Sequence, residues 1–250
     1  MSLLTQPKIS VIIPAHNEEK YIEKTLESIS KQTFSEVETI VVANGCTDKT
    51  EEIVKEKVKE YQQEKKNQQK NVRLLSLPKA NVSVARNAGA LNAQGELLVF
   101  LDADTSLEAN GLETIHQQFA EKHAVATTLS LPEEKKITYR LALWFKNANL
   151  YSKIYKGCSG AFICRKKDFH SVGGYNPQLS VREHRKLTLK LLDKGKYTCI
   201  PTYATTSMRR FQQWGISKVA WFWVAQWAKD TFNGNENKKN IENTVYEKVR

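Results

Sequence analysis

Two aspartates separated by a single residue, Asp102 and Asp104, are the strongest chemical signal in the sequence. They follow the apolar run 96–101, so both carboxylates can turn toward one site at the end of a strand. Holding two like charges together is costly unless a cation lies between them. Mg²⁺ and Mn²⁺ prefer oxygen ligands and combine one or two carboxylates with phosphate oxygens. The pair therefore predicts a divalent metal site, with helix capping by Asp104 or Thr105, ahead of Leu107, as the alternative.

Two further polar segments also follow apolar runs, at residues 14–18 (PAHNE) and 43–48 (ANGCTD). In open α/β sheets, ligands bind beyond the carboxyl ends of the strands. The three segments together therefore predict one site built from three strand ends. Each also fits a plainer role, because Asn17, Glu18 and Asp48 suit helix caps and first-turn acids. The two roles are compatible, since a helix N-terminus also attracts phosphate.

The elements that must position these residues are short β-branched runs alternating with amphipathic helical patterns. We expect strands at 9–13, 37–42, 72–77, 96–101 and 124–131, and helices at 21–29, 53–61, 83–92 and 107–121. This alternation predicts parallel strands joined by right-handed crossovers, in an open sheet covered on both faces. Farther along we expect a helix at 137–155, a strand near 161–164, a Gly-rich loop at 172–177 and a helix at 183–193.

The composition of the 250-residue chain, 40% hydrophobic and 26% charged, is typical of a globular protein and argues against disordered and multi-span membrane classes. A net charge of +11 favours an anionic partner. We exclude nucleic acid, because the lysine-rich residues 55–71 are interleaved with glutamates and lack an aromatic stacking platform. Four scattered cysteines without a CxxC pair, and no secretory signal pattern, predict ordinary thiols and a cytoplasmic location.

Several segments resemble, in order and spacing, the motifs of family-2 glycosyltransferases with the GT-A fold. They are VIIPAHNE at 11–18, IVVANGCTD at 40–48, ARNAG at 85–89 and GELLVFLDADT at 95–105. Two later segments, GCSGAFICRKKDF at 157–169 and VGGYN at 172–176, resemble the acceptor-side half of that family. One motif would be weak evidence, but an ordered series is specific, and the resemblance covers about residues 8–195.

The resemblance implies an α/β, Rossmann-like GT-A domain with a mostly parallel sheet. On this basis we expect one domain over 1–207, divided into a nucleotide-sugar-binding half at 8–131 and an acceptor-side half at 132–207. It further implies inverting transfer from a nucleoside-diphosphate sugar, such as a UDP- or GDP-sugar, with Mg²⁺ or Mn²⁺ as cofactor. The acceptor is unknown, with lipid-linked compounds and polysaccharides as candidates.

The resemblance also implies which residues meet the nucleotide sugar: Pro14, Ala15, Asn17, Glu18, Asn44, Arg86, Asp102, Ala103 and Asp104. The family often has Asp where this chain has Asn44, which leaves the identity of the base open. The fixed charge of Arg86 suits a diphosphate or a base edge, with a surface ion pair as the alternative. Asp104, with Asp102 nearby, would hold the metal that offsets charge on the leaving diphosphate.

The general base of the family is a carboxylate after the Gly-Gly loop, usually within a Glu-Asp pair. This chain has Glu183-His184 at that place. Glu183 shares a spacing of four with Leu187 and Leu191, so it begins an inward-facing helical stripe and is our predicted base. His184 is the second candidate, because neutral imidazole is a competent base near pH 7. In the third interpretation Glu183 only complements the helix dipole.

The segment 214–228 contains four of the five tryptophans and one charge, Lys218. We expect a C-terminal amphipathic helix over 208–232 and a polar tail over 233–250. Fifteen residues are too few for a membrane span of about 20. The helix could lie on the anionic inner face of a membrane, or pack on its own domain or in a homodimer. For the whole chain, a nucleotidyltransferase and a non-catalytic nucleotide-sugar-binding protein are the alternatives to a glycosyltransferase.

Overall fold

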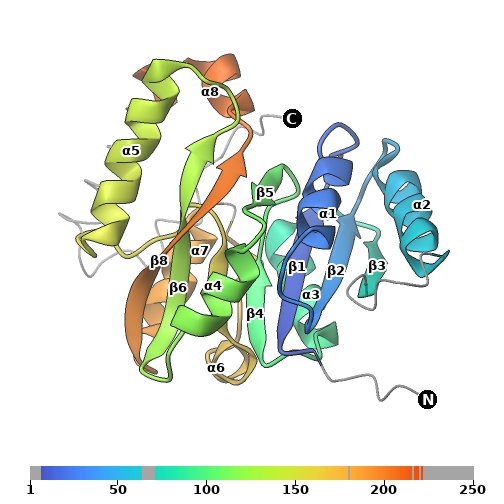
Figure 1. Cartoon of the computed structure of the whole chain (residues 1–250), viewed down its shortest axis with the longest axis horizontal. Helices are drawn as coiled ribbons and strands as arrows, with labels where there is room; N and C mark the ends of the chain where they lie inside the picture. The colour runs from blue at the N-terminus through green and yellow to red at the C-terminus, as the bar shows by residue number, and fades with distance from the viewer. Residues whose placement is uncertain (1–6, 64–70, 180, 216, 220, 222–250) are drawn as a thin grey trace.

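The computed structural model describes residues 7–63, 71–179, 181–215, 217–219 and 221. These residues form an α/β fold around an eight-stranded sheet with the strand order β3-β2-β1-β4-β7-β6-β8-β5 (Figure 1). The strands are β1 (Ile9–Ala15), β2 (Val37–Asn44), β3 (Asn71–Leu77), β4 (Leu97–Phe100), β5 (Thr105–Leu107), β6 (His123–Pro132), β7 (Phe162–Arg165) and β8 (Lys196–Thr206). The helices are α1 (Ile22–Ser30), α2 (Thr50–Gln63), α3 (Val82–Asn92), α4 (Gly111–Gln118), α5 (Ile137–Tyr151), α6 (Lys166–Ser171), α7 (Glu183–Leu191) and α8 (Arg209–Trp214).

The N-terminal half is the parallel sheet that the apolar runs predict. β1 pairs in parallel with β2 and β4, and β2 pairs in parallel with β3. Helices α1, α2 and α4 pack on one face, while α3, α6 and α7 pack on the other (Figure 1). Because both faces are covered, every residue of β1 and β2 is buried, which explains why their sequences are mostly apolar and do not alternate.

The C-terminal half makes the sheet mixed. β7 lies between β4 and β6 and is antiparallel to both, whereas β6 and β8 are parallel. The short strand β5 pairs antiparallel with β8, so it occupies residues that we expected to begin a helix at 107. Helix α4 begins only at Gly111, and its N-cap position is Asn110. Asp104 and Thr105 therefore do not cap this helix, and the capping alternative is excluded.

A glycine in the ARNAG segment lets α3 approach β1 closely. A Cβ atom at Gly89 would lie 2.4 Å from Cγ2 of Ile12, so only a residue without a side chain fits without a shift. Arg86 lies one turn earlier on the same helix and is buried. The close approach of the helix to the sheet thus brings a buried cation next to the strand ends.

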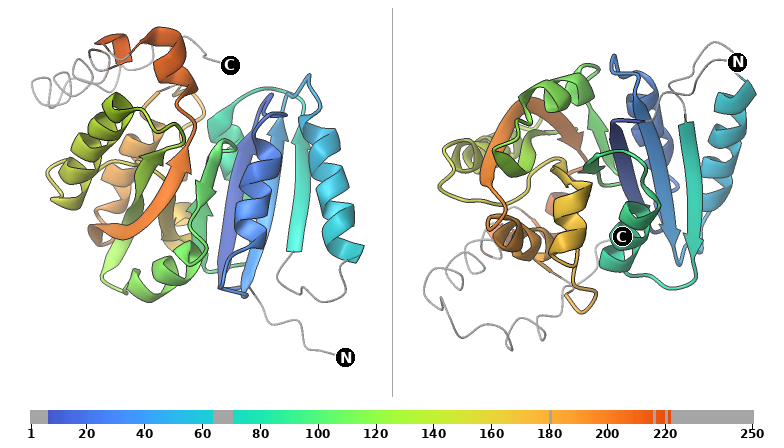
Figure 2. Two further views of the ribbon diagram at one scale, coloured as in Figure 1. Left: turned by 45° about the horizontal axis from the view of Figure 1, so that its top comes forward. Right: turned by 90° about the horizontal axis from the view of Figure 1, so that it is seen from below.

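Helix α5 lies at one side of the molecule (Figure 2). It packs against β6 and β8, and its Tyr139 and Leu143 form a small cluster with Met208 and Phe211 beside α8. Helix α8 ends at Trp214, and Gly215 follows with a φ of 78°. The rest of the expected Trp-rich helix from residue 222 onward, and the polar tail at 233–250, lie outside the described residues. In the described part of the chain, no helix is long and apolar enough to cross a membrane.

Candidate active site

The loops after β1 and β2 are joined by side-chain hydrogen bonds. Asn17 has a φ of 55°, and its Oδ1 accepts a 2.8 Å hydrogen bond from the backbone N–H of Thr47. Asp48 accepts from the N–H groups of Glu19 and Thr50, at 3.1 and 3.0 Å, and so caps α2. Burial raises the pKa of Asp48, but these hydrogen bonds outweigh it and the pKa lies below its ordinary value. The capping role predicted for Asp48 is confirmed.

Asn44 is buried, and its amide joins three elements. Its Nδ2 donates to the carbonyl of Ala15 at 2.8 Å, and its Oδ1 accepts from the N–H of Asn81 at 2.9 Å, just before α3. Pro14 and Ala15 are themselves buried at the end of β1. Both ends of the Asn44 amide are therefore engaged with the backbone, and its contact with a nucleobase stays a prediction.

Arg86 joins two of the predicted site carboxylates. Its Nη1 donates to Oε1 of Glu183 and its Nη2 donates to Oδ1 of Asp102, each at 2.9 Å. The guanidinium also lies 5.3 Å from the ring centroid of Tyr175. Because Arg86 is buried, the surface ion pair that we considered is excluded. The structure brings together three residues that lie at positions 86, 102 and 183 of the sequence.

Glu183 is the first residue of α7, and its side chain is only 15% exposed. Burial raises the pKa of this carboxyl. The positive charge of Arg86 and the hydrogen bond from its guanidinium lower the pKa by more than burial raises it. The net shift is downward, so Glu183 is ionised at neutral pH. An ionised, positioned carboxylate is able to accept a proton.

His184 points into an aromatic cluster. Its Nδ1 lies 2.9 Å from the hydroxyl of Tyr175, and its ring stacks on Phe162 with 5.1 Å between the centroids. Burial, followed by the nearby charge of Arg86, lowers the pKa of His184 to about 4. The imidazole is therefore neutral at pH 7, and one of its two nitrogens is already engaged.

Asp104 and Glu18 are joined by a residue that our sequence reasoning missed, Arg209 of α8. The guanidinium donates to both oxygens of Glu18, each at 2.7 Å, and its Nη2 lies 3.1 Å from Oδ2 of Asp104. The sequence places Arg209 beside the Trp-rich segment, and its separation of 191 residues from Glu18 carries no local pattern. Its two contacts with Glu18 form a bidentate pair, the strongest geometry for such ions.

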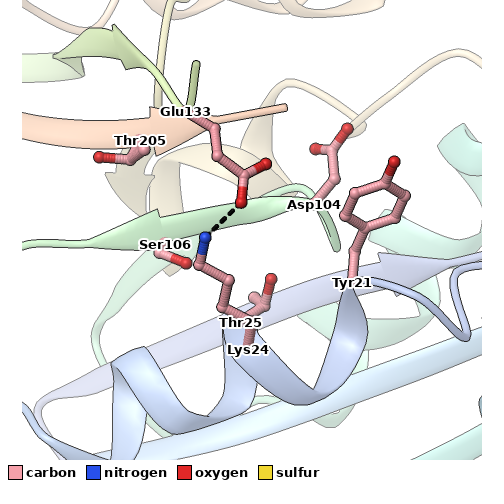
Figure 3. Close-up of a pocket in the computed structure, with 7 residues that line it drawn as sticks. All are labelled: Tyr21, Lys24, Thr25, Asp104, Ser106, Glu133 and Thr205. Carbon is pink, nitrogen blue, oxygen red and sulfur yellow. Dashed lines mark hydrogen bonds and ion pairs between the residues drawn. The ribbon is translucent and has the colours of Figure 1, made fainter. Parts of the chain in front are cut away.

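The carboxyl of Asp104 is strongly perturbed. Burial and the charge of Asp102 raise its pKa to about 6, although Arg209 opposes this effect. Burial also raises the pKa of Glu18, again against Arg209. Asp104 lines a small hollow together with Tyr21, Thr25 and others, shown in Figure 3.

The donor set fits a divalent cation in part. Asp102 is 56% exposed and Asp104 lies two residues away, so the two offer carboxylate oxygens, which Mg²⁺ and Mn²⁺ prefer. Burial is the main cause of the raised pKa of Asp104, the charge of Asp102 adds to it, and a cation between the two carboxylates would relieve this repulsion. Within the described residues, no group of three or more His, Cys, Asp or Glu side chains is placed to hold a metal. A cation here would therefore complete its shell with substrate oxygens or water.

The order of these elements and the residues at the strand ends match a known family. The sequence model described as "Glycosyl transferase family 2" matches residues 10–213. The chain belongs to glycosyltransferase family 2. The predicted family is thereby confirmed, and the match extends from β1 into α8.

Curated relatives of this glycosyltransferase family match part of the chain. Glycosyltransferase GlyA of Streptococcus pneumoniae is 32% identical over 162 residues, which is 63% of this chain and 21% of GlyA. Glycosyltransferase GlyG of the same organism is 34% identical over 116 residues, which is 46% of this chain and 36% of GlyG. The chain thus spans about a fifth to a third of the length of these two relatives.

Solved structures confirm the predicted GT-A fold. Residues 1–349 of S. aureus TarS, in complex with UDP-GlcNAc, align with a TM-score of 0.61 and 23% identity over 80% of this chain and 58% of that one. The mannosyltransferase PcManGT from Pyrobaculum calidifontis, in complex with GDP-Man and Mn²⁺, aligns with a TM-score of 0.66 and 18% identity over 81% of this chain and 57% of that one.

Proposed function

We propose that this family-2 glycosyltransferase moves a sugar from a nucleoside-diphosphate sugar to an acceptor hydroxyl with inversion at the anomeric carbon. One observation carries the proposal: Arg86 holds the strand-end carboxylate of Asp102 and the ionised carboxylate of Glu183 on a single buried guanidinium, each at 2.9 Å. In this proposal Asp102 is a carboxylate on the donor side and Glu183 is the base, and direct displacement on a sugar would need both to be held in fixed positions.

Glu183 is the proposed general base. It is ionised at neutral pH, it is partly exposed, and its contact with Arg86 fixes its position. A positioned base of this kind contributes about 10²–10⁴-fold to the rate. His184 is the weaker candidate, because Tyr175 engages its Nδ1 and its ring is stacked on Phe162. Its proposed part is to pack the start of α7 in place.

The donor would lie along the ends of β1, β2 and β4. Pro14, Ala15, Asn17, Glu18 and Asn44 form the proposed nucleoside end, while Asp102, Ala103 and Asp104 form the diphosphate end. Asp104 and Asp102 would hold Mg²⁺ or Mn²⁺, which would neutralise charge on the departing diphosphate. Related folds in complex with UDP-GlcNAc and with GDP-Man support a UDP- or GDP-sugar donor without selecting between them.

The proposed location is the cytoplasm, at the inner face of the membrane. In support, all four cysteines are free thiols. The expected role of residues 214–228, on a membrane or in a homodimer, also stays a proposal. The acceptor, whether lipid-linked or a polysaccharide, is part of the same proposal.

A thermal-shift panel with UDP, GDP, their sugars and Mn²⁺ tests the donor. Binding to the folded state raises the melting temperature by mass action, so the correct donor with metal should give the largest shift. Turnover should then release a nucleoside diphosphate. Release of pyrophosphate from a nucleoside triphosphate would instead indicate a nucleotidyltransferase, and metal-dependent nucleotide binding without turnover of any donor and acceptor would indicate a binding protein.

A pair of adjacent variants tests the base. Glu183→Gln keeps an oxygen that can accept from Arg86, so we expect an unchanged donor-induced thermal shift and a turnover lower by about 10²–10⁴-fold. His184→Gln should retain turnover within about tenfold of the wild-type rate. Near-normal turnover by Glu183→Gln, or a larger loss with His184→Gln, would contradict the assignment.

A further inference from the structure

Helix α5 exposes one long apolar face. Its members are large, exposed hydrophobic side chains of α5 and of the segment that follows it: Ile137, Leu141, Trp144, Phe145, Tyr151 and Ile154. Their spacing of three, four and seven places those within the helix on one side. These six residues make up more than half of the eleven large hydrophobics that the described part of the chain exposes. We refer to them as the α5 face.

The opposite side of α5 attaches the helix to the domain. Tyr139, Leu143 and Leu150 are buried, and Asn147 exchanges two hydrogen bonds with the backbone of Ser130 on β6. The helix therefore has a separate, complete set of packing contacts. The α5 face is additional to them, so substitution of its members should leave the fold intact.

The α5 face is large for a surface that remains in water. An aromatic side chain presents about 150–250 Å², so Trp144 and Phe145, each 67% exposed, together present roughly 200–350 Å². The remaining four residues enlarge this area. Contiguous apolar patches beyond a few hundred Å² are rare on monomers and mark interaction sites.

The charge along α5 is predominantly positive, although Glu133 and Glu134 directly precede the segment. The segment from Lys135 to Lys156 contains six cations and no aspartate or glutamate. Arg140 lies on the helix at the border of the apolar face, and Lys153 and Lys156 follow its C-terminal end; all three are exposed. An apolar face bordered by Lys and Arg, with Trp and Phe on the apolar side, is typical of helices that lie in the interface of an anionic bilayer.

We propose that the α5 face docks on an anionic lipid surface. The alternative of a second copy of the chain is disfavoured by charge, because a twofold contact would bring the two basic borders together. Phospholipid headgroups of negative charge instead complement the cations, while the acyl boundary accepts the aromatic and aliphatic side chains. This proposal is independent of the reaction proposed above and is tested without measuring sugar transfer.

Co-sedimentation of the full-length chain with vesicles tests the proposal. We expect binding to vesicles of phosphatidylcholine with phosphatidylglycerol, and binding at least tenfold weaker to phosphatidylcholine alone or in high salt. Leu141→Glu should weaken the binding at least tenfold. Leu91→Glu is the matched control, since Leu91 is also helical and exposed, at 74% against 59% for Leu141, but lies on α3; this change should alter binding less than twofold.

A second variant, Trp144→Ser with Phe145→Ser, removes apolar area without adding charge and should also weaken binding at least tenfold. Circular dichroism confirms that each variant is folded. Three results would overturn the proposal: no binding to anionic vesicles, equal effects of Leu141→Glu and Leu91→Glu, or a wild-type dimer in light scattering that Leu141→Glu converts to a monomer. Loss of binding through Trp223→Ser and Trp227→Ser alone, with Leu141→Glu neutral, would assign the contact to the Trp-rich segment and overturn it as well.

Discussion

Replacing Arg86 by methionine removes the charge that holds Asp102 and Glu183 together. The two carboxylates differ in exposure, at 56% for Asp102 and 15% for Glu183. The free energy of unfolding that is lost with each ion pair should therefore differ. Breaking a buried pair by removing one partner costs about 3–5 kcal/mol, and a fully exposed pair contributes about 0–1 kcal/mol. The pair with Asp102 lies between these limits, because its guanidinium is buried and its carboxylate is half exposed. We therefore expect Arg86→Met to lower the free energy of unfolding by about 3–4 kcal/mol at pH 7, the larger part of it through Glu183.

Two double-mutant cycles, with stability measured by urea denaturation, separate the contributions of the two ion pairs to the free energy of unfolding. They combine Arg86→Met with Glu183→Gln and, separately, with Asp102→Asn. Residues in contact typically show coupling energies of about 0.5–3 kcal/mol. We expect a coupling of about 2–3 kcal/mol for the pair with Glu183, because its charge is the more buried, and a smaller coupling of about 1 kcal/mol for the pair with Asp102.

The exposed ion pair between Lys8 and Glu36 is the control, with side chains that are 52% and 30% exposed. Lys8→Met should cost less than about 1 kcal/mol. The pH dependence adds a second check: the folded state lowers the pKa of Glu183, so its contribution is fully present above its ordinary value of 4.5 and is lost as the pH falls through the lowered pKa. A coupling with Asp102 that equals or exceeds the coupling with Glu183 would refute the reasoning.

Three further predictions follow from the same contacts. Asp104→Asn should abolish the Mn²⁺-dependent thermal shift by nucleotides, yet raise the free energy of unfolding without metal by about 1–3 kcal/mol at pH 8, because the raised pKa of about 6 penalises the ionised folded state. The gain in the free energy of unfolding should fall below about 1 kcal/mol at pH 4, where the carboxyl is largely protonated in the folded state. An undiminished gain in urea denaturation at pH 4 would contradict the raised pKa of Asp104. Tyr175→Phe removes the hydroxyl beside His184 and should cost about 0.5–1.5 kcal/mol, with turnover within about tenfold of wild type; a loss matching that of Glu183→Gln would contradict Glu183 as base. Gly89→Ala should cost about 1–3 kcal/mol, since its Cβ would meet Ile12, and an unchanged melting temperature would contradict this packing.

Sequence reasoning was most successful where a pattern is local. β1 and β2 are buried on both faces, so their sequences are rich in β-branched apolar residues and predict strands directly. β5 has only three residues, and the eleven residues of β8 include a proline and many threonines, so neither has such a run. Both strands exist because they pair with each other and, for β8, with β6. Tertiary contacts of this kind leave little trace in a single sequence.

The residues of the candidate site likewise fall into those with a local sequence signal and those without one. Residues that follow strands, such as Asp102 and Asp104, could be predicted because strand ends share one edge of a sheet. The contact between Arg86 and Glu183 could be predicted only as two members of one family site, since 97 residues separate them. Arg209 was missed because an arginine beside a tryptophan-rich segment is equally typical of a surface helix. Arg209 reaches the site because β8 ends at the edge of the site and α8 follows it directly.

The position of Arg209 has a thermodynamic consequence. Its guanidinium lies against Oδ2 of Asp104 at 3.1 Å, the carboxylate that the proposed metal ion would use. A metal ion bound by Asp104 would therefore compete with the guanidinium for this carboxylate, and the linkage between the two would be reciprocal. A force that draws α8 away from the strand ends would raise the affinity for metal, and bound metal would loosen α8 by the same free energy. Metal occupancy at the proposed site and the position of α8 would then be linked in a single equilibrium.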